Sequence, residues 1–269
     1  MSDFQPVSRS AFAARRFQRF STYRHAADRT VVALAAQEIN QACTSMPICF
    51  IEAPDGSGLT TVALLGLLAG QNLYVAPDGR WIGPYIPALL RVWPFSLARA
   101  DDKQLLCVDV ASGLISEGDA GERFYEDDGE PSHFTLQTLE ALKQHQAGTR
   151  SLQRLVAALQ AEQLITPWLL KVPVAGAERS LSGLWRIDEQ RLADLPPDAL
   201  ARIHQAGALP LVYSQLISMQ HARLLVKFAG ELQRAELAQR QAASSSLMPT
   251  KDGELDLEFL NKSDTLSFG

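Results

Sequence analysis

The sequence contains few cysteines, and their number and spacing exclude two kinds of site. Its 269 residues include three of them, Cys43, Cys49 and Cys107, and no two are spaced as in a C-x-x-C pair. An odd number without that spacing argues against a disulfide framework and against a structural zinc site. Cys49 and Cys107 stand in apolar stretches, where a cysteine is usually a small buried hydrophobic residue. We therefore expect free thiols and no bound metal.

Long apolar runs and a basic excess are also missing. The most apolar run, residues 62–70, is far shorter than the roughly 18 residues that a membrane-spanning helix needs. No apolar core follows the basic N-terminal start, so we expect a cytoplasmic protein with no secretory signal and no transmembrane segment. The formal net charge is −5, whereas proteins that bind nucleic acid through its phosphates usually show a strong basic excess. We therefore expect no nucleic-acid partner.

Catalytic and cofactor motifs are missing as well. The sequence has no G-x-S-x-G nucleophile motif, no calcium-loop pattern and no histidine pair at metal-ligand spacing. The glycine-rich stretch IEAPDGSGLTT (51–61) has Leu59 where a phosphate-binding loop has lysine. Adjacent carboxylates occur in polar loops, whereas acid–base catalysis needs two carboxyl groups in different environments. The sequence therefore predicts no catalytic residue and no cofactor, and an enzyme is the less favoured class.

What the sequence does contain is turn chemistry between apolar stretches. Asp-Gly occurs at 55–56, 78–79, 128–129 and 252–253. Glycine tolerates the positive φ of a tight turn, and aspartate bonds its own backbone there. Three strands of an antiparallel meander are therefore predicted, at MPICFIEA (46–53), LTTVALLGL (59–67) and QNLYV (71–75). Four further strands are predicted at 95–100, 104–110, 168–174 and 181–187.

Apolar residues at helical spacing predict the helices. They are expected over 31–43, 86–95, 134–159 and 195–207, and from about 210 to 240. Gly148 is expected to break or bend the third helix, and Gly207 stands where a glycine ends the fourth. Antiparallel strands in the N-terminal half, packed helices and a long C-terminal helix together predict an α+β fold.

The expected domain organisation has four parts. Residues 1–29 carry six arginines against two aspartates and are predicted as an irregular basic arm before a single α+β domain at 30–240. The polar stretch 241–253 has the composition of a linker. Residues 254–269 begin with apolar and acidic side chains in alternation, as in a half-buried strand. This tail either pairs with the domain's own sheet, which we favour, or adds a strand to a partner.

Two pairs of residues are candidate binding residues. Trp81 and Tyr85 follow the Asp-Gly turn in NLYVAPDGRWIGPYIP (72–87), and Trp and Tyr are favoured at interaction hot spots. Packing of a rigid loop against the core is the alternative interpretation of this pair. His221, with Gln220 beside it, lies on a mainly apolar helix face. A histidine there is more often a core residue with its hydrogen bonds satisfied than a catalyst.

Several stretches together resemble the SapC-like family of bacterial proteins. They include MPICFIEA, LLGLLAGQNLYVAPDGRWIGPYIPALLRVWPFSLA, LCVDVASGLISEG, FYEDDGEPS, GLWRIDEQRL, AGALPLVYSQLISMQHARLL and the ending LDLEFLNKSDTLSFG. The resemblance covers about 45–269. It implies at most a role linked to bacterial surface layers, or an accessory role beside outer-membrane receptor systems and oxygenase- or halogenase-like enzymes. It carries over no catalytic residue.

These observations favour a non-enzymatic accessory protein. It would recognise a protein or peptide partner through the loop with Trp81 and Tyr85, and through the tail. One alternative is an enzyme with a dispersed site around His221 and Gln220. The other is a structural component of the surface layer.

Overall fold

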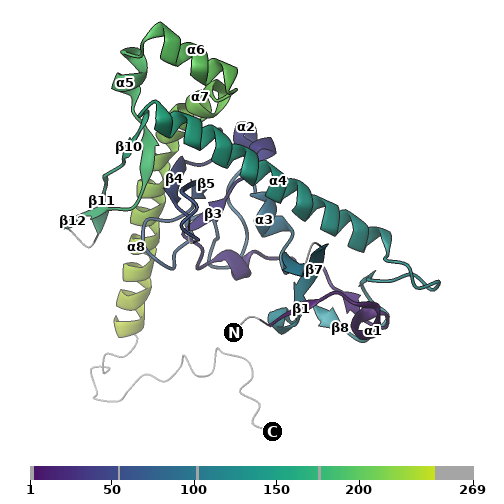
Figure 1. Cartoon of the computed structure of the whole chain (residues 1–269). Coiled ribbons are helices and arrows are strands. Elements are labelled where there is room, and N and C mark those ends of the chain that lie inside the picture. The colour runs from purple at the N-terminus through teal and green to yellow at the C-terminus, as the bar shows by residue number, and fades with distance from the viewer. Residues whose placement is uncertain (1–2, 54, 101–102, 175–176, 246–269) are drawn as a thin grey trace, which may run out of the picture. The chain divides into compact units, whose positions relative to one another are not determined.

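The computed structural model describes residues 3–53, 55–100, 103–174 and 177–245 of the chain (Figure 1). Contacts divide the chain into a body, residues 1–225, and a second unit, residues 226–269. The body combines several small antiparallel sheets with helices, one of them long. The predicted α+β class is confirmed.

The largest sheet of the body is antiparallel and five-stranded. Its strands follow the order β10 (Ile165–Pro167), β13 (Trp185–Ile187), β4 (Ile48–Glu52), β5 (Leu59–Leu64) and β3 (Val31–Ala33). The hairpin of β4 and β5 pairs Ile48 with Ala63 and Glu52 with Leu59. Gly56 in the turn between them has a φ of +71°. The two predicted strands and the Asp-Gly turn that joins them are confirmed.

On the side away from β4, β5 pairs with β3. The sequence predicted that a helix over 31–43 starts at these residues. Val31 and Val32 pair with Leu64 and Ala63. A 3₁₀ turn (Ala36–Glu38) and α2 (Ile39–Ala42) follow. The helix prediction is therefore wrong at its start. β-Branched residues suit a strand when a partner edge is available, and helical spacing within one segment carries no information about that edge.

Residues 71–75 form turns, so the prediction of a strand there is wrong. The buried Asn72 side chain donates from Nδ2 to the Ala26 carbonyl at 2.9 Å and accepts the Tyr74 N–H at 2.9 Å. An asparagine that bonds nearby backbone competes with strand pairing. An isolated bridge joins Val75 to Trp81 around the Asp78-Gly79 turn, and Gly79 has a φ of +90°. That predicted turn is confirmed.

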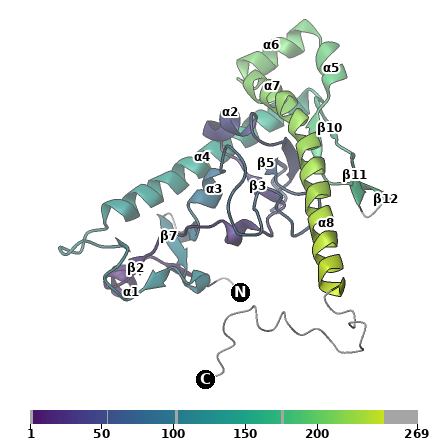
Figure 2. The same cartoon turned by 180° about the vertical axis from the view of Figure 1, so that it is seen from behind.

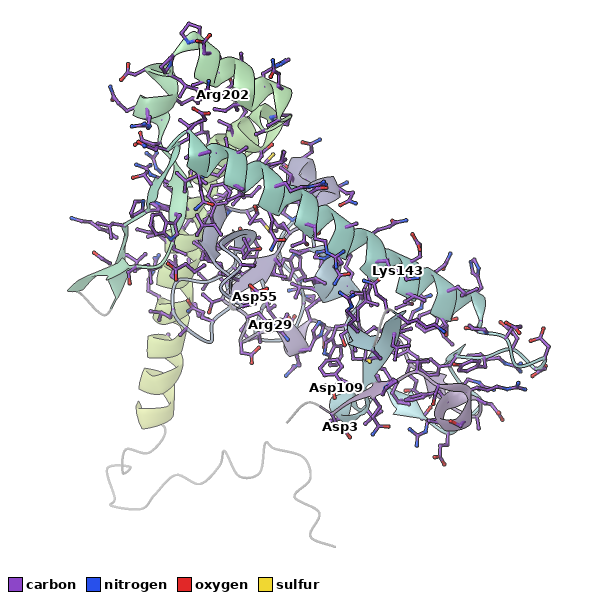
Figure 3. All side chains as sticks on the ribbon, viewed as in Figure 1. Asp3, Arg29, Asp55, Asp109, Lys143 and Arg202 are labelled. Atoms are coloured by element: carbon purple, nitrogen blue, oxygen red, sulfur yellow. The ribbon has the colours of Figure 1, made fainter. Side chains whose placement is uncertain are left out.

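The N-terminal segment, expected to be an irregular arm, contains regular elements that pair with distant parts of the chain. Its elements are β1 (Phe4–Pro6), α1 (Arg9–Phe12), β2 (Arg16–Phe17) and a 3₁₀ turn (Arg24–Ala26). The Asp3 N–H donates to Asp109 Oδ1 at 2.8 Å, where β1 meets the end of β7 (Figure 3). Phe12 and Phe17 are 0% and 4% exposed. Burying a side chain of this size stabilises a fold by about 1.5–3 kcal/mol, which explains why basic composition did not leave the segment in solvent.

The two strands of this segment belong to two different three-stranded sheets. In one, β1 pairs with β7 (Lys103–Asp109), which pairs with β6 (Phe95–Ala100). In the other, β2 lies between β8 (Ile115–Ser116) and β9 (Glu122–Arg123). A 3₁₀ turn (Val110–Ser112) links β7 to β8, and α3 (Ala88–Arg91) precedes β6. The predicted short helix before Pro94 and the two predicted strands after it are confirmed.

The long helix α4 (His133–Ala161) connects these sheets. It contacts the 3₁₀ turn at 36–38 near its middle, and it also contacts β5, β6, β9 and α3 (Figures 1 and 2). Ser132 caps its first turn, since Ser132 Oγ accepts the Thr135 N–H at 3.2 Å. Its buried face contains Leu152, Val156 and Leu159, whose helical spacing agrees with the predicted helix. The predicted helix is confirmed and extends further at its N-terminus by one residue and at its C-terminus by two.

Gly148 does not break α4, and that prediction is wrong. A Cβ built there would lie 2.8 Å from Ala35 Cβ and 3.0 Å from the Ala36 backbone nitrogen, and the Gln37 amide would be closer still. The glycine is therefore a contact point. It lets the helix backbone pack directly against Ala35 and the first two residues of the 3₁₀ turn that carries Glu38.

Gly148→Ala is expected to lower the free energy of unfolding by about 1–3 kcal/mol, the usual cost of overpacking a tight contact. The gain in helix propensity of about 1 kcal/mol is too small to offset it, because the clash includes backbone. Urea denaturation measures the change. The control is Gly230→Ala in α8, where a Cβ meets only Arg234 Nη2 at 3.9 Å, and which should stabilise the helix. Equal stabilisation by both variants would contradict the packing role.

The C-terminal part of the body begins after α4 with a hairpin and short helices. The hairpin pairs β11 (Leu170–Val174) with β12 (Ala177–Leu181). The helices are α5 (Glu189–Ala193), α6 (Pro197–Gln205) and α7 (Leu209–Ser218). Gly207 follows α6 with a φ of +73°, which confirms it as the helix-ending glycine. The strand predicted at 168–174 is confirmed as β11. The strand predicted at 181–187 is confirmed only over its last three residues, which form β13, whereas Leu181 ends β12.

The predicted last helix is divided. A 3₁₀ turn (Met219–His221) separates α7 from α8 (Ala222–Ser245). Ser218 Oγ donates to the Gln215 carbonyl at 2.6 Å, which uses an oxygen that would accept a backbone N–H in a continuous helix. A long C-terminal helix is present as α8, which supplies the described part of the second unit. Residues 241–245, predicted as the start of a linker, belong to α8, so the linker prediction is wrong there. The rest of the predicted linker and the tail at 254–269 lie outside the described residues.

Candidate functional site

The predicted pair Trp81 and Tyr85 is engaged in contacts within the body. Trp81 Nε1 donates to the Tyr85 carbonyl at 2.9 Å. The Trp81 indole stacks on Tyr74, with ring centroids 5.4 Å apart and planes at 15°, and its edge contacts Tyr23 at 5.9 Å. Gly83 leaves room for this stack, since a Cβ there would lie 2.8 Å from the Tyr74 ring. The loop is rigid because both aromatic side chains are fixed, and both remain half-buried.

The Tyr85 side chain ends at a buried carboxylate. Glu38 is 5% exposed, and its Oε1 accepts the Tyr85 hydroxyl and the Ala88 N–H, each at 2.6 Å. Its Oε2 accepts the Ala35 N–H at 3.1 Å and lies 3.2 Å from His145 Nε2. One side chain thus joins the 3₁₀ turn at 36–38, the loop, the start of α3 and the middle of α4.

These contacts keep Glu38 ionised. Burial alone would raise its pKa, but the contacts with His145, Tyr85, Ala88 and Ala35 outweigh burial and hold the pKa below its ordinary value. Burial and the hydrogen bond to this carboxylate raise the pKa of the Tyr85 phenol. Sequence reasoning did not single out Glu38. The local signal was an acidic residue at the third position of a helix start, a common capping arrangement.

The second predicted pair lies where α7 ends. His221 Nε2 is 3.2 Å from the Cys43 carbonyl, and its Nδ1 is buried without a hydrogen-bond partner among the described residues. The Gln220 side chain is exposed. Trp81, Tyr85, Gln220 and His221 line neither of the two pockets described below. The structure therefore does not bring the two pairs together in either pocket.

A groove with a volume of about 340 Å³ lies between the N-terminal segment, the end of α3 and α4. We call it the aromatic groove. Its aromatic lining comprises Phe17, Phe20, Tyr23, Trp93, Phe95 and Phe134, and its rim contains Arg19 and Arg91. Val92 and the α4 residues Gln137, Thr138 and Ala141 complete the lining. Phe20, Tyr23, Trp93 and Phe134 are neither fully buried nor fully exposed, so their rings are available to a ligand.

Ring contacts hold the aromatic groove in shape. Trp93 stacks on His25, with centroids 4.1 Å apart and planes at 4°. Phe20 meets Trp93 edge-on at 5.6 Å, and Phe17 stacks on Phe134 at 5.3 Å. His25 Nε2 lies 3.2 Å from the Leu90 carbonyl, and burial lowers the pKa of the imidazole. The imidazole of His25 that stacks on Trp93 is therefore uncharged at pH 7.

The rim of the aromatic groove is positively charged. Arg19 donates from Nε and Nη2 to Glu122 Oε1, at 3.1 and 2.9 Å. Arg91 lies 5.9 Å from the Tyr85 ring centroid, and its charge offsets part of the rise that burial causes in the pKa of Tyr23. No carboxylate is among the lining residues. The groove therefore combines aromatic faces with an arginine that has no paired carboxylate among the described residues.

The sequence indicated only the neighbourhood of one part of this groove. Trp93 and Phe95 belong to the same stretch as Trp81 and Tyr85, but the arm prediction placed Phe17, Phe20 and Tyr23 in solvent. A signal was present in RFQRFSTY (16–23), where an aromatic residue stands at every third position. That density is unusual for a solvated arm.

Neither metal nor thiol chemistry is supported by the described residues. No group of three or more His, Cys, Asp or Glu side chains in the described ranges could hold a metal ion. All three cysteines are buried, and burial raises the pKa of the Cys49 thiol to about 12. A neutral thiol is a poor nucleophile.

Comparison with known proteins gives one match. A family model described as SapC matches residues 7–225 of the chain, which spans the body from α1 to the first turn of α8. No match was found among the curated proteins or among the solved structures. Within the described residues, no helix has the length and hydrophobicity that crossing a membrane requires.

Proposed function

The chain belongs to the SapC family, and we propose that it is a non-enzymatic binding protein that holds a peptide segment of a partner protein in the aromatic groove. The occupant is an extended segment with an aromatic or proline residue next to an acidic one. The accessory role that the resemblance implies, beside cell-surface or outer-membrane receptor systems, indicates such systems as the first place to look for the partner.

One observation carries this proposal: half-exposed aromatic rings converge beneath an arginine rim with no carboxylate in the lining. Tryptophan, tyrosine and arginine dominate the binding energy of protein interfaces. Aromatic-lined grooves also hold proline-rich segments. Arg91 would pair with an acidic residue of the segment, and a charge-assisted hydrogen bond is stronger than a neutral one. The charge of the rim thus favours an acidic partner.

The predicted residues Trp81 and Tyr85 support the groove in this proposal. Trp81 contacts the edge of Tyr23, a lining residue. Tyr85 lies under the Arg91 guanidinium. Through Glu38, which accepts from both Tyr85 and the first N–H of α3, the loop holds the helix that carries Arg91. A preformed site of this kind loses less conformational entropy on binding than a mobile one.

The proposal predicts a peptide preference that depends on Arg91. Panning a random dodecapeptide display library against the full chain should enrich sequences with an acidic residue next to an aromatic or proline residue. In calorimetry, Arg91→Glu should weaken the best peptide at least tenfold, which corresponds to about 1.4 kcal/mol. Trp93→Ala should weaken it similarly, because the indole face is lost.

The matched control is Arg154→Glu, the same charge reversal on an exposed side chain of α4 that is outside the groove lining. It should bind the peptide as the unaltered chain does. Enrichment of no acidic motif, or equal affinity of the Arg91→Glu variant and the control, would refute the proposal. A natural partner captured from cells supports it only if its binding segment contains the motif and is displaced by the selected peptide.

A further inference from the structure

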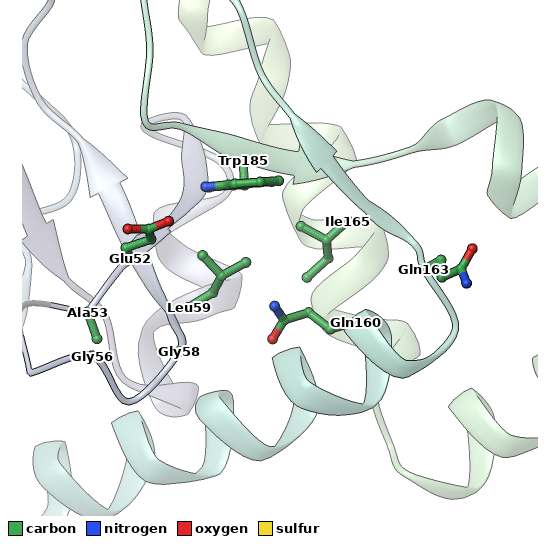
Figure 4. Close-up of a pocket in the computed structure, with 9 residues that line it drawn as sticks. All are labelled: Glu52, Ala53, Gly56, Gly58, Leu59, Gln160, Gln163, Ile165 and Trp185. Carbon is green, nitrogen blue, oxygen red and sulfur yellow. The ribbon is translucent and has the colours of Figure 1, made fainter.

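A second pocket, with a volume of about 560 Å³, lies where α4 ends beside the largest sheet (Figure 4). We call it the Trp185 pocket. Its lining comes from β4, β5, β10, β13, the loop at 53–58 and the C-terminal end of α4, and it comprises Glu52, Leu59, Gln160, Gln163, Ile165 and Trp185, with Ala53, Gly56 and Gly58. None of these residues lines the aromatic groove, so the two sites are independent.

The register of the sheet explains why these side chains meet. Trp185 pairs with Phe50, and Glu52 pairs with Leu59. Residues two apart on a strand share a face, and partners across two strands share it as well. Trp185, Glu52 and Leu59 therefore stand on one face of the sheet. The end of α4 at Ala161 leaves this corner of the sheet uncovered, with Gln160 and Gln163 at its rim.

The polar groups of the Trp185 pocket are largely unused. Across the described residues, the side chains of Glu52 and Gln160 have no hydrogen bond or ion pair, whereas Gln163 Oε1 accepts from Arg191 Nη2 at 2.7 Å. Figure 4 views the Trp185 ring from its edge, so that one face of the ring is turned toward the pocket. The Glu52 carboxylate lies beside the ring. No lysine or arginine is among the lining residues. The pocket thus has an aromatic face and a carboxylate with no cation to neutralise it.

Gln163 adds a backbone feature at the rim. Its φ is +55°, the one positive φ at a non-glycine residue in the described ranges. At this position, just after the end of a helix, glycine would adopt the same conformation with less strain. The sequence therefore keeps an amide-bearing side chain at the rim in a conformation that strains the backbone. Residues held in this way cluster at ligand sites.

We propose that the Trp185 pocket binds a small organic cation. Its ammonium or guanidinium group would lie over the Trp185 indole face, which attracts cations through its electron-rich surface. The Glu52 carboxylate would pair with the same group, and the Gln160 amide oxygen would accept a hydrogen bond from it. The pocket volume lies within the range of small-molecule sites, about 300–1,000 Å³. The other candidate occupant is a neutral polyol stacked on the indole, which gains no attraction from the carboxylate's charge.

The test compares cations with a neutral isostere. Choline, agmatine and cadaverine are titrated into the full chain by calorimetry at low salt, with 3,3-dimethylbutanol as the uncharged counterpart of choline and glucose as the polyol. At least one cation should bind with a Kd below about 1 mM, which corresponds to about 4.1 kcal/mol. Its affinity should exceed that of the isostere and of glucose at least tenfold.

Two variants assign the binding to this pocket. Glu52→Gln keeps the side-chain shape, removes the charge, and should weaken the cation at least tenfold. Glu189→Gln, the same change on an exposed residue of α5 outside the lining, should leave it unaltered. Absence of cation binding, equal binding of the isostere or glucose, or an affinity that is unaffected by Glu52→Gln would each overturn the proposal. Loss of peptide binding at the aromatic groove would leave this test unaffected.

Discussion

Glu38→Ala is expected to lower the free energy of unfolding by about 3–5 kcal/mol, the usual cost of breaking a buried charged contact. The variant leaves the Tyr85 hydroxyl and the N–H groups of Ala35 and Ala88 without their acceptor. Each buried donor without a partner costs about 1–3 kcal/mol. His145 also loses its contact at 3.2 Å. Urea denaturation at pH 7, with an unchanged m-value, measures the loss.

Two further variants show where this stability comes from. Tyr85→Phe removes one donor and should cost about 1.5–3 kcal/mol, the value for a hydrogen bond to a charged group. Glu140→Ala on the exposed face of α4 removes a carboxylate from the same helix that supplies His145 and should change stability by less than about 0.5 kcal/mol. A Glu38→Ala chain as stable as the Glu140→Ala chain would show that the buried carboxylate is not the anchor described here.

The contribution of Glu38 should depend on pH in one direction. Its folded-state pKa lies below the ordinary value of 4.5, so the unfolded chain binds the proton more readily. The stability that the charge supplies is then fully present above pH 4.5 and is lost as the pH falls through the folded pKa. The stability difference between the unaltered chain and Glu38→Gln should therefore shrink as the pH is lowered below 4.5. A difference that is constant or growing in that range would contradict the ionised state.

Gln215→Leu is expected to lower the free energy of unfolding by about 2–6 kcal/mol, since two backbone groups lose their partners at about 1–3 kcal/mol each. Gln215 is 0% exposed. Its Oε1 accepts the Ile187 N–H and its Nε2 donates to the Ile48 carbonyl, both at 3.1 Å. The side chain therefore joins β13 to β4 where their register includes a single pair, Trp185 with Phe50. Leucine fills a similar volume but offers neither group.

Amide hydrogen exchange supplies a local measurement of this bridge. In the Gln215→Leu variant, the Ile187 N–H should exchange faster relative to the N–H groups of the β4–β5 hairpin. The control is Gln220→Leu, the same substitution at an exposed side chain five residues further along the chain, which should change stability by less than about 0.5 kcal/mol. Equal stability of the two variants would refute the bridging role. Because Gln220 is also a predicted binding residue, its variant should be tested for binding as well.

The candidate site was predictable only where its residues lie close together in the sequence. Trp93 and Phe95 lie in the same aromatic stretch as the predicted pair Trp81 and Tyr85. Glu38 did not stand out, because its importance comes from His145, 107 positions away, and from Tyr85, 47 positions away. Phe20 and Tyr23 were missed because the arginines around them indicate a solvated segment. Their partial burial depends on a sheet and a helix supplied by residues far along the chain.

The sequence by itself determined the elements whose signals are local. The β4–β5 hairpin follows from two apolar stretches around an Asp-Gly turn, and α6 follows from a proline at its start and Gly207 at its end. The strands β6 and β7, the start of α4 after Ser132 and the α+β class follow from the same kind of short-range pattern. Such signals act within a few residues, through backbone φ, capping hydrogen bonds and the spacing of apolar side chains.

The tertiary structure decided whatever depends on a partner distant in the sequence. Val31 and Val32 form a strand because β5 offers them an edge, and Gly148 is a contact point because residues 35–37 press against it. Glu38 and Gln215 satisfy backbone groups that no local pattern connects to them. The physical reason is the same in each case. The free energy of a buried hydrogen bond or a close packing contact depends on which atoms are brought together in space, and one segment of sequence does not contain that information.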